Sequence, residues 1–226
     1  MTTRPYTIKM PMAAQGDLSK GKIMTFYIIR HAHKEKGSFY NPRLRHQDEP
    51  ISEVGREEAC RLWSYFCNKG ISAIYVSSYQ RTMQTIEYVA AKLGIVPIID
   101  ERLNEIDNGC LDGMSDEAIQ LRYPEIWRIR QERTADFRFP DGETGEEARQ
   151  RIAGFLEEKR KVHANANIVL VSHEGLIRLL MCHIMNQPVY HRWNFHYVDF
   201  CGITEITYQP EYKIWKLIRF NQKFIQ

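Results

Sequence analysis

The sequence predicts an α/β fold, a three-layer sandwich in which helices cover both faces of a mostly parallel central sheet. Short apolar runs rich in β-branched residues alternate with amphipathic helical segments, and several of these runs end abruptly in polar clusters. Such alternation is typical of parallel sheets that are buried on both faces. A length of 226 residues, 43% of them hydrophobic, suits one such domain.

Four apolar runs are the expected parallel strands, at residues 23–29, 73–76, 96–99 and 167–171. The polar loop after the first strand closes at Ser52, which is a potential helix N-cap. Ala59, Leu62 and Phe66 then recur at the spacing of one buried helical face. A second helix follows the second strand and ends at Gly94.

The second half of the chain continues the pattern. Ser115 and Pro124 begin two short helices in a charged insertion, about residues 114–140, which we expect over the C-terminal edge of the sheet. A capping box at residues 144–147 opens a longer helix. Another helix follows the fourth strand. Alternating segments predict a closing antiparallel hairpin at residues 203–207 and 213–217.

Composition and charge exclude several classes of protein. Thirty-one Lys and Arg against 28 Asp and Glu leave a net charge of +3, which does not indicate a nucleic-acid partner. No run reaches the roughly 18 consecutive apolar residues of a membrane span. Five cysteines without CxxC spacing indicate neither a disulfide framework nor a zinc ribbon. We expect a cytoplasmic protein with no membrane partner, a flexible arm at residues 1–22 and one domain at 23–222.

Reactive side chains follow the predicted strands, at the edge where α/β sheets bind ligands. They are Arg30, His31, Arg81, Glu105 and His173. Two arginine forks at one point can hold the oxygens of a dianionic phosphoryl group. A histidine can attack phosphorus to form a phosphohistidine, and a carboxylic acid such as Glu105 can protonate a departing alkoxide.

Seven short motifs occur in one order over about residues 24–222. They are Arg30-His31-Ala32; Pro50-Ile51-Ser52-Glu53-Val54-Gly55 with Ala59; Ser77-Ser78 with Arg81-Thr82 and Thr85; Arg102-Leu103-Asn104-Glu105-Ile106 with Gly109 and Gly113; Gly142-Glu143-Thr144 with Arg151; Ser172-His173-Glu174-Gly175; and Arg219-Phe220-Asn221. Each motif is weak alone. The ordered set resembles the histidine phosphatase superfamily, in its phosphoglycerate-mutase-like branch.

The resemblance implies roles for five residues. His31 would be the nucleophile, and Arg30 and Arg81 would clamp the phosphate. His173 would be a further phosphate donor, and Glu105 would be the acid that becomes the base for hydrolysis. No metal and no organic cofactor is implied. The expected activity is a metal-independent phosphatase that acts on a small phosphorylated metabolite through a phosphohistidine and releases inorganic phosphate.

The sequence departs from the family pattern at several positions. Lys34 stands where the family often has a small hydroxyl residue, and Glu174 replaces the common Gly after the second histidine. Leu111-Asp112 replaces an aromatic-acidic pair. The mutases' Tyr-Gly-x-Leu-x-Gly stretch is not matched at residues 108–114, which favours hydrolysis over mutase activity.

Three alternatives remain open. One is a phosphosugar mutase, and another is a non-catalytic protein that binds a phospholigand on the same fold. The third is a metal pair formed by His31 and His33, as in barrel-type metallohydrolases. The other histidines, His46 among them, are expected at the surface or in packing. The loop at residues 34–50 and the insertion should line the pocket mouth, and no motif specifies an oligomeric interface.

Overall fold

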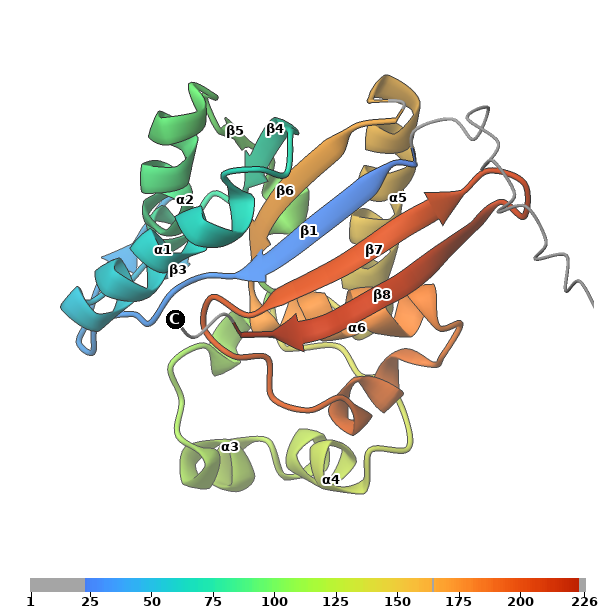
Figure 1. The fold of residues 1–226 in the computed structure, drawn as a ribbon. Coiled ribbons are helices and arrows are strands. Elements are labelled where there is room, and N and C mark those ends of the chain that lie inside the picture. The colour runs from blue at the N-terminus through green and yellow to red at the C-terminus, as the bar shows by residue number, and fades with distance from the viewer. Residues whose placement is uncertain (1–22, 164, 224–226) are drawn as a thin grey trace, which may run out of the picture.

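A computed structural model describes residues 23–163 and 165–223 and has a six-stranded sheet at its centre (Figure 1). The strands are β1 (Thr25–Arg30), β4 (Ile71–Val76), β5 (Ile98–Ile99), β6 (Asn167–Ser172), β7 (Ile203–Gln209) and β8 (Ile214–Gln222). Their order is β5-β4-β6-β1-β7-β8. The first four strands in this order pair in parallel, whereas β7 runs antiparallel to both β1 and β8. The predicted parallel sheet with an antiparallel addition is confirmed.

Helices cover both faces of the sheet. They are α1 (Glu53–Phe66), α2 (Gln80–Leu93), α3 (Asp116–Arg122), α4 (Pro124–Glu132), α5 (Gly145–Val162) and α6 (Glu174–Ile184), with short 3₁₀ turns at Glu101–Leu103, Gly109–Leu111 and Val189–Asn194. Among the described residues, no helix combines the length and apolarity needed to cross a bilayer.

Alternation along β1 shows how the layers form. Phe26 and Ile28 belong to the apolar cluster that includes the inner faces of α5 and α6. Tyr27 and Ile29 point the other way, into the cluster with α1 and α2. Successive strand side chains face opposite sides, so each strand contributes to both cores. The three-layer sandwich expected from the sequence is therefore confirmed.

Capping residues lie at the starts and ends of helices where the sequence predicts them. The side chain of Ser52 accepts a hydrogen bond from the N–H of Gly55, and both bonds of the capping box form at Thr144. The Ser115 side chain caps α3 in the same way. Gly94 closes α2 in the left-handed conformation, at φ 67°, which a residue without a Cβ adopts with little strain.

Two elements differ from the expectation. The third strand is only two residues long and lies at the edge of the sheet, paired with β4 alone. Val96, which was predicted to belong to it, lies before the strand and is 84% exposed. The loop after β1 contains a small hairpin of β2 (Tyr40–Asn41) and β3 (His46–Gln47). In Figure 1 the insertion helices α3 and α4 lie on the side to which the arrowheads of β1 and β6 point. The predicted arm at 1–22 falls outside the described residues.

Candidate active site

The carboxyl ends of three neighbouring strands bring the predicted motifs together at one edge of the sheet. β4, β6 and β1 are adjacent, and the last residue of β1 lies beside the last residue of β6. The N–H of His31 donates to the carbonyl oxygen of Ser172 at 2.9 Å, and that of Ser77 donates to Val171 at 3.3 Å. As a result, the rings of His31 and His173 lie with their centroids 5.2 Å apart.

His31 is buried and its ring has a defined orientation. Nδ1 lies 2.8 Å from the carbonyl oxygen of Ala32, so Nδ1 carries the proton and donates it. Burial and the positive charge of Arg81 hold the pKa of His31 well below its usual value of 6.5. The ring is therefore neutral near pH 7, and its lone pair is on Nε2, as a nucleophile requires.

His173 lies beside His31 and is also neutral. Its exposed fraction is 1%, and burial together with the charge of Arg81 holds its pKa well below the usual value. Nε2 lies 2.8 Å from the hydroxyl oxygen of Ser77, and Nδ1 lies 3.4 Å from Nη2 of Arg81. The Ser77 hydroxyl and Arg81 thus fix the orientation of the His173 ring beside His31.

Arg30 and Arg81 are both buried and both stack on aromatic rings. The guanidinium of Arg30 lies 4.1 Å from the ring centre of Phe200 and 4.6 Å from that of Tyr197, and Arg81 lies 4.2 Å from that of Tyr79. Within the part of the chain that the structure describes, the Nε atoms of both arginines, and that of Arg178, are buried without a hydrogen-bond partner. A buried donor without a partner destabilises a fold by about 1–3 kcal/mol. Two such donors at the strand ends indicate a site that an anion completes.

Glu105 is held by the start of α6. Its carboxylate accepts hydrogen bonds at 2.9–3.1 Å from the N–H groups of Ile106, Gly175 and Leu176. Arg151 supports the same loop by donating to the carbonyl oxygen of Glu105 at 2.9 Å. The carboxylate therefore has a defined position beside the segment that carries His173.

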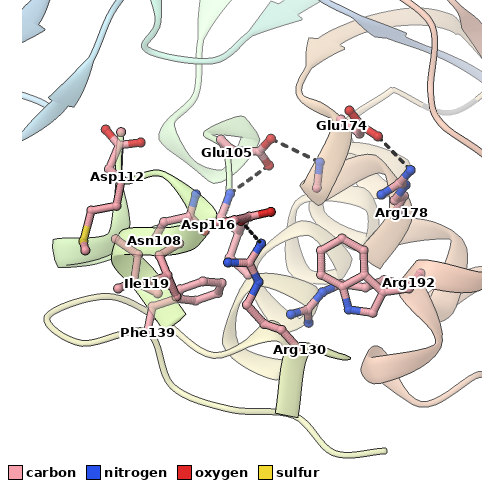
Figure 2. Close-up of a pocket in the computed structure, with 16 residues that line it drawn as sticks. Glu105, Asn108, Asp112, Asp116, Ile119, Arg130, Phe139, Glu174, Arg178 and Arg192 are labelled. Atoms are coloured by element: carbon pink, nitrogen blue, oxygen red, sulfur yellow. Dashed lines mark hydrogen bonds and ion pairs between the residues drawn. The ribbon is translucent and has the colours of Figure 1, made fainter. Parts of the chain in front are cut away.

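Glu105 lines several cavities. One, of about 450 Å³, is lined by Glu105 and by residues of the insertion, including Asp116, Ile119 and Arg130 (Figure 2). Another, of about 590 Å³, is lined by Glu105 and by the loop after β1. A smaller one, of about 150 Å³, is lined by Glu105 and Arg81. The insertion and the loop after β1 both contribute lining residues, as the sequence predicts.

Two histidines outside the five predicted residues have clear partners. His33 turns its Nδ1 to the Ser52 hydroxyl at 2.7 Å. His46 was expected at the surface or in packing; it is buried between the carboxylates of Asp107, at 3.0 Å, and Asp112, at 3.2 Å. The hydrogen bond to Asp112 raises the pKa of His46. Among residues 23–163 and 165–223, no three His, Cys, Asp or Glu side chains are grouped as metal ligands.

The sequence did not indicate Glu49 as a site residue. Its carboxylate lies 3.3 Å from Nη1 of Arg81 and 2.6 Å from Nζ of Lys34. Glu174, noted only as a departure from the family, lies 3.0 Å from Nη1 of Arg30. No local pattern identifies Glu49, because its partner Arg81 is 32 residues away.

Related proteins align with most of this chain in sequence. Phosphoserine phosphatase 1 of Hydrogenobacter thermophilus is 33% identical over 171 residues, which cover 74% of this chain and 79% of that protein. A probable phosphoglycerate mutase GpmB of Enterobacter is 30% identical over 196 residues, with 83% of this chain and 86% of the relative covered.

Solved structures show the same fold. The mycobacterial glucosyl-3-phosphoglycerate phosphatase aligns with a TM-score of 0.76 at 20% identity, over 88% of this chain and 99% of that one. The α-ribazole phosphatase of Shigella flexneri aligns at 0.73 and 22% identity, over 90% and 98%. The family model of the histidine phosphatase superfamily (branch 1) matches residues 26–223. The resemblance inferred from the motifs is thereby confirmed, and the chain belongs to the histidine phosphatase superfamily.

Proposed function

We propose that this chain hydrolyses phosphate monoesters of small metabolites, without a metal ion, through a phosphohistidine on His31. The observation that carries the proposal is the pair of buried, unpartnered Nε donors on Arg30 and Arg81, which accompany two neutral imidazoles at the same sheet edge. Such donors suit the equatorial oxygens of a transferring phosphoryl group, whose charge is stabilised mainly by fixed positive groups.

In the first step, Nε2 of His31 attacks phosphorus and the bond from phosphorus to the ester oxygen breaks. Glu105 gives its proton to the departing oxygen, since an alkoxide is too basic to leave unprotonated. The proton of His31 stays on Nδ1, which donates it to the Ala32 carbonyl oxygen, and this accepting oxygen stabilises the positive charge that develops on the ring. In the second step, water attacks the phosphohistidine, Glu105 accepts a proton from that water, and inorganic phosphate is released.

The leaving group would lie in a cavity that Glu105 lines, such as the one of about 450 Å³, because the acid has to reach the ester oxygen. That volume suits a small metabolite. The names of the relatives support the same size class: one is called a phosphoserine phosphatase, and one neighbour is a glucosyl-3-phosphoglycerate phosphatase that also has a complex with inorganic phosphate. The five cysteines are unpaired, which fits the reducing cytoplasm that we propose as its location.

A phosphosugar mutase is the second candidate, supported by the relatives named as probable phosphoglycerate mutases. Product analysis separates the two activities, because a mutase yields an isomerised ester and a phosphatase yields free phosphate. A non-catalytic phospholigand binder would need the arginines but would have no use for Glu105.

The direct test is His31→Ala. We expect this variant to release no phosphate from p-nitrophenyl phosphate or from a panel of phosphorylated metabolites, and to form no labelled phosphoenzyme. Undiminished turnover would refute the role of His31. Treatment with EDTA should leave the wild-type rate unchanged, whereas a loss that zinc restores would favour the metal-pair alternative.

A further inference from the structure

Both phosphate clamps are already paired with a carboxylate, and each carboxylate bridges to a second cation. Oε2 of Glu174 lies 3.0 Å from Nη1 of Arg30, and Oε1 of Glu174 lies 2.8 Å from Nη2 of Arg178. Glu49 lies between Arg81 and Lys34 in the same way, as described above. The site thus contains two relays in which a clamp, a carboxylate and an outer cation follow one another.

The two relays hold the same part of each guanidinium. Nη1 of Arg30 donates to the Val198 carbonyl and pairs with Glu174, and Nη1 of Arg81 donates to the Gln47 carbonyl and pairs with Glu49. The Nε atom of each clamp is buried and has no hydrogen-bond partner among residues 23–163 and 165–223. The carboxylates therefore occupy one side of each fork and leave the Nε side for another ligand.

We propose that Glu49 and Glu174 are positioning residues that fix the two arginine clamps before phosphate binds. The proposal rests on the phosphatase function proposed above. An arginine side chain loses rotamer freedom when it binds a ligand, and a clamp already held in place loses less of it. The four cations and two carboxylates of the relays leave two positive charges, which match a phosphomonoester dianion.

The relays also give a role to two departures from the family pattern. Lys34 stands in place of a small hydroxyl residue and is the outer cation of one relay. Glu174 stands in place of a glycine and is the carboxylate of the other. Taken alone, neither side chain has an evident role beside a phosphate site. In the relays, Lys34 is the cation that pairs with Glu49, and Glu174 is the carboxylate that pairs with Arg30.

A competing account is that the carboxylates are anions that phosphate has to displace. The two accounts predict opposite effects on phosphate affinity. Removal of a competing negative charge strengthens phosphate binding by Coulomb attraction alone. Removal of a positioning carboxylate frees the arginine and weakens binding.

The experiment measures phosphate binding by isothermal titration calorimetry, and p-nitrophenyl phosphate kinetics, for Glu174→Ala and Glu49→Ala. We expect the Kd of inorganic phosphate and the KM to rise by roughly tenfold in each variant. This loss of affinity corresponds to part of the conformational entropy that a pre-positioned arginine saves on binding. The change in kcat should be smaller, as for a group that binds ground and transition states alike. Phosphate affinity equal to or tighter than wild type in the alanine variants would overturn the proposal.

Conservative variants and a control separate positioning from a general loss of structure. Glu174→Gln and Glu49→Gln keep one oxygen for the clamp and should recover most of the affinity. The control is Glu205→Ala. Glu205 on β7 pairs with Arg219 on β8, and its carboxylate, 12% exposed, is buried to a similar extent, so its removal should leave phosphate binding unchanged. Failure of the glutamine variants to recover affinity would also count against positioning.

A double-variant cycle shows whether the effect passes through the clamp. In an Arg30→Ala background, Glu174→Ala should have no further effect on phosphate affinity; a full additive effect would refute the relay. Calorimetry needs no turnover, so a chain that binds phosphate with this pattern but hydrolyses nothing would refute the phosphatase function and leave the relays standing. The two glutamates lie on different elements, so misfolding of one variant leaves the other as a complete test.

Discussion

Replacement of Gly175 by alanine tests whether the position of the Glu105 carboxylate controls protonation of the leaving group. A Cβ atom at residue 175 would lie 2.7 Å from Oε1 of Glu105 and 3.2 Å from Cδ. The N–H of Gly175 also donates to this carboxylate at 3.1 Å. Because α6 holds the backbone while the Glu105 side chain can rotate, the carboxylate has to move away from its place beside the cavity.

The expected effect depends on the leaving group. A positioned general acid contributes about 10²- to 10⁴-fold, so kcat/KM for an alkyl phosphate should fall by about 10²-fold. A nitrophenolate leaves without a proton, and p-nitrophenyl phosphate should lose about threefold or less. Alanine favours the helix by about 0.5–1 kcal/mol, whereas one displaced charged hydrogen bond costs about 1.5–3 kcal/mol. The free energy of unfolding should therefore fall by about 1–2 kcal/mol, and the fold should persist.

The assay compares kcat/KM for the two classes of substrate, because this ratio reports steps up to cleavage of the ester bond. Gly154→Ala on α5 is the matched control: a Cβ atom there meets nothing within 4 Å. The control should keep wild-type rates and gain about 0.5–1 kcal/mol of stability. Equal losses on alkyl and aryl substrates in the Gly175 variant, or no loss on either, would refute the reasoning.

Two further predictions concern the histidines. Ser77→Ala removes the hydroxyl 2.8 Å from Nε2 of His173 and should weaken phosphate inhibition by about tenfold, a loss of about 1.4 kcal/mol, with no change in the unfolding midpoint beyond a few degrees; an unchanged inhibition constant would contradict it. The lowered pKa values of His31 and His173 mean that these rings stay neutral in the native state while the unfolded chain takes up protons below about pH 6.5. The stabilisation that these neutral rings provide should therefore be complete above about pH 6.5, and the free energy of unfolding should fall as the pH drops from 6.5 toward 5. Urea unfolding should show this slope to be shallower by about 1.4 kcal/mol per pH unit in His173→Gln, and an identical slope would sink the explanation.

Local signals in the sequence were sufficient for most of the architecture. The first strand, observed at Thr25–Arg30, was predicted at residues 23–29 from an apolar run, and the helix starting after Ser52 was predicted from a capping residue and a buried-face period. These features depend on residues within about one or two turns of each other. The third strand was predicted too long, because apolar residues such as Val96 do not reveal that a strand lies at the edge of a sheet.

The gathering of the five predicted side chains at one edge could also be predicted, because parallel strands present their carboxyl ends at one edge. Their catalytic roles stay a prediction. What no local pattern showed was how each group is held: the proton on Nδ1 of His31, the Ser77 hydroxyl on His173, and the carboxylates on the two clamps.

The sequence by itself therefore determined the layers, the caps and which side chains gather at one edge of the sheet. The tertiary structure decided their partners, their charge states and which side of each arginine is left for a ligand. The physical reason is distance along the chain: Glu49 meets Arg81 across 32 residues, and Ser77 meets His173 across 96. Such contacts, and the burial that keeps the imidazoles neutral, exist only once several strands and helices have packed together.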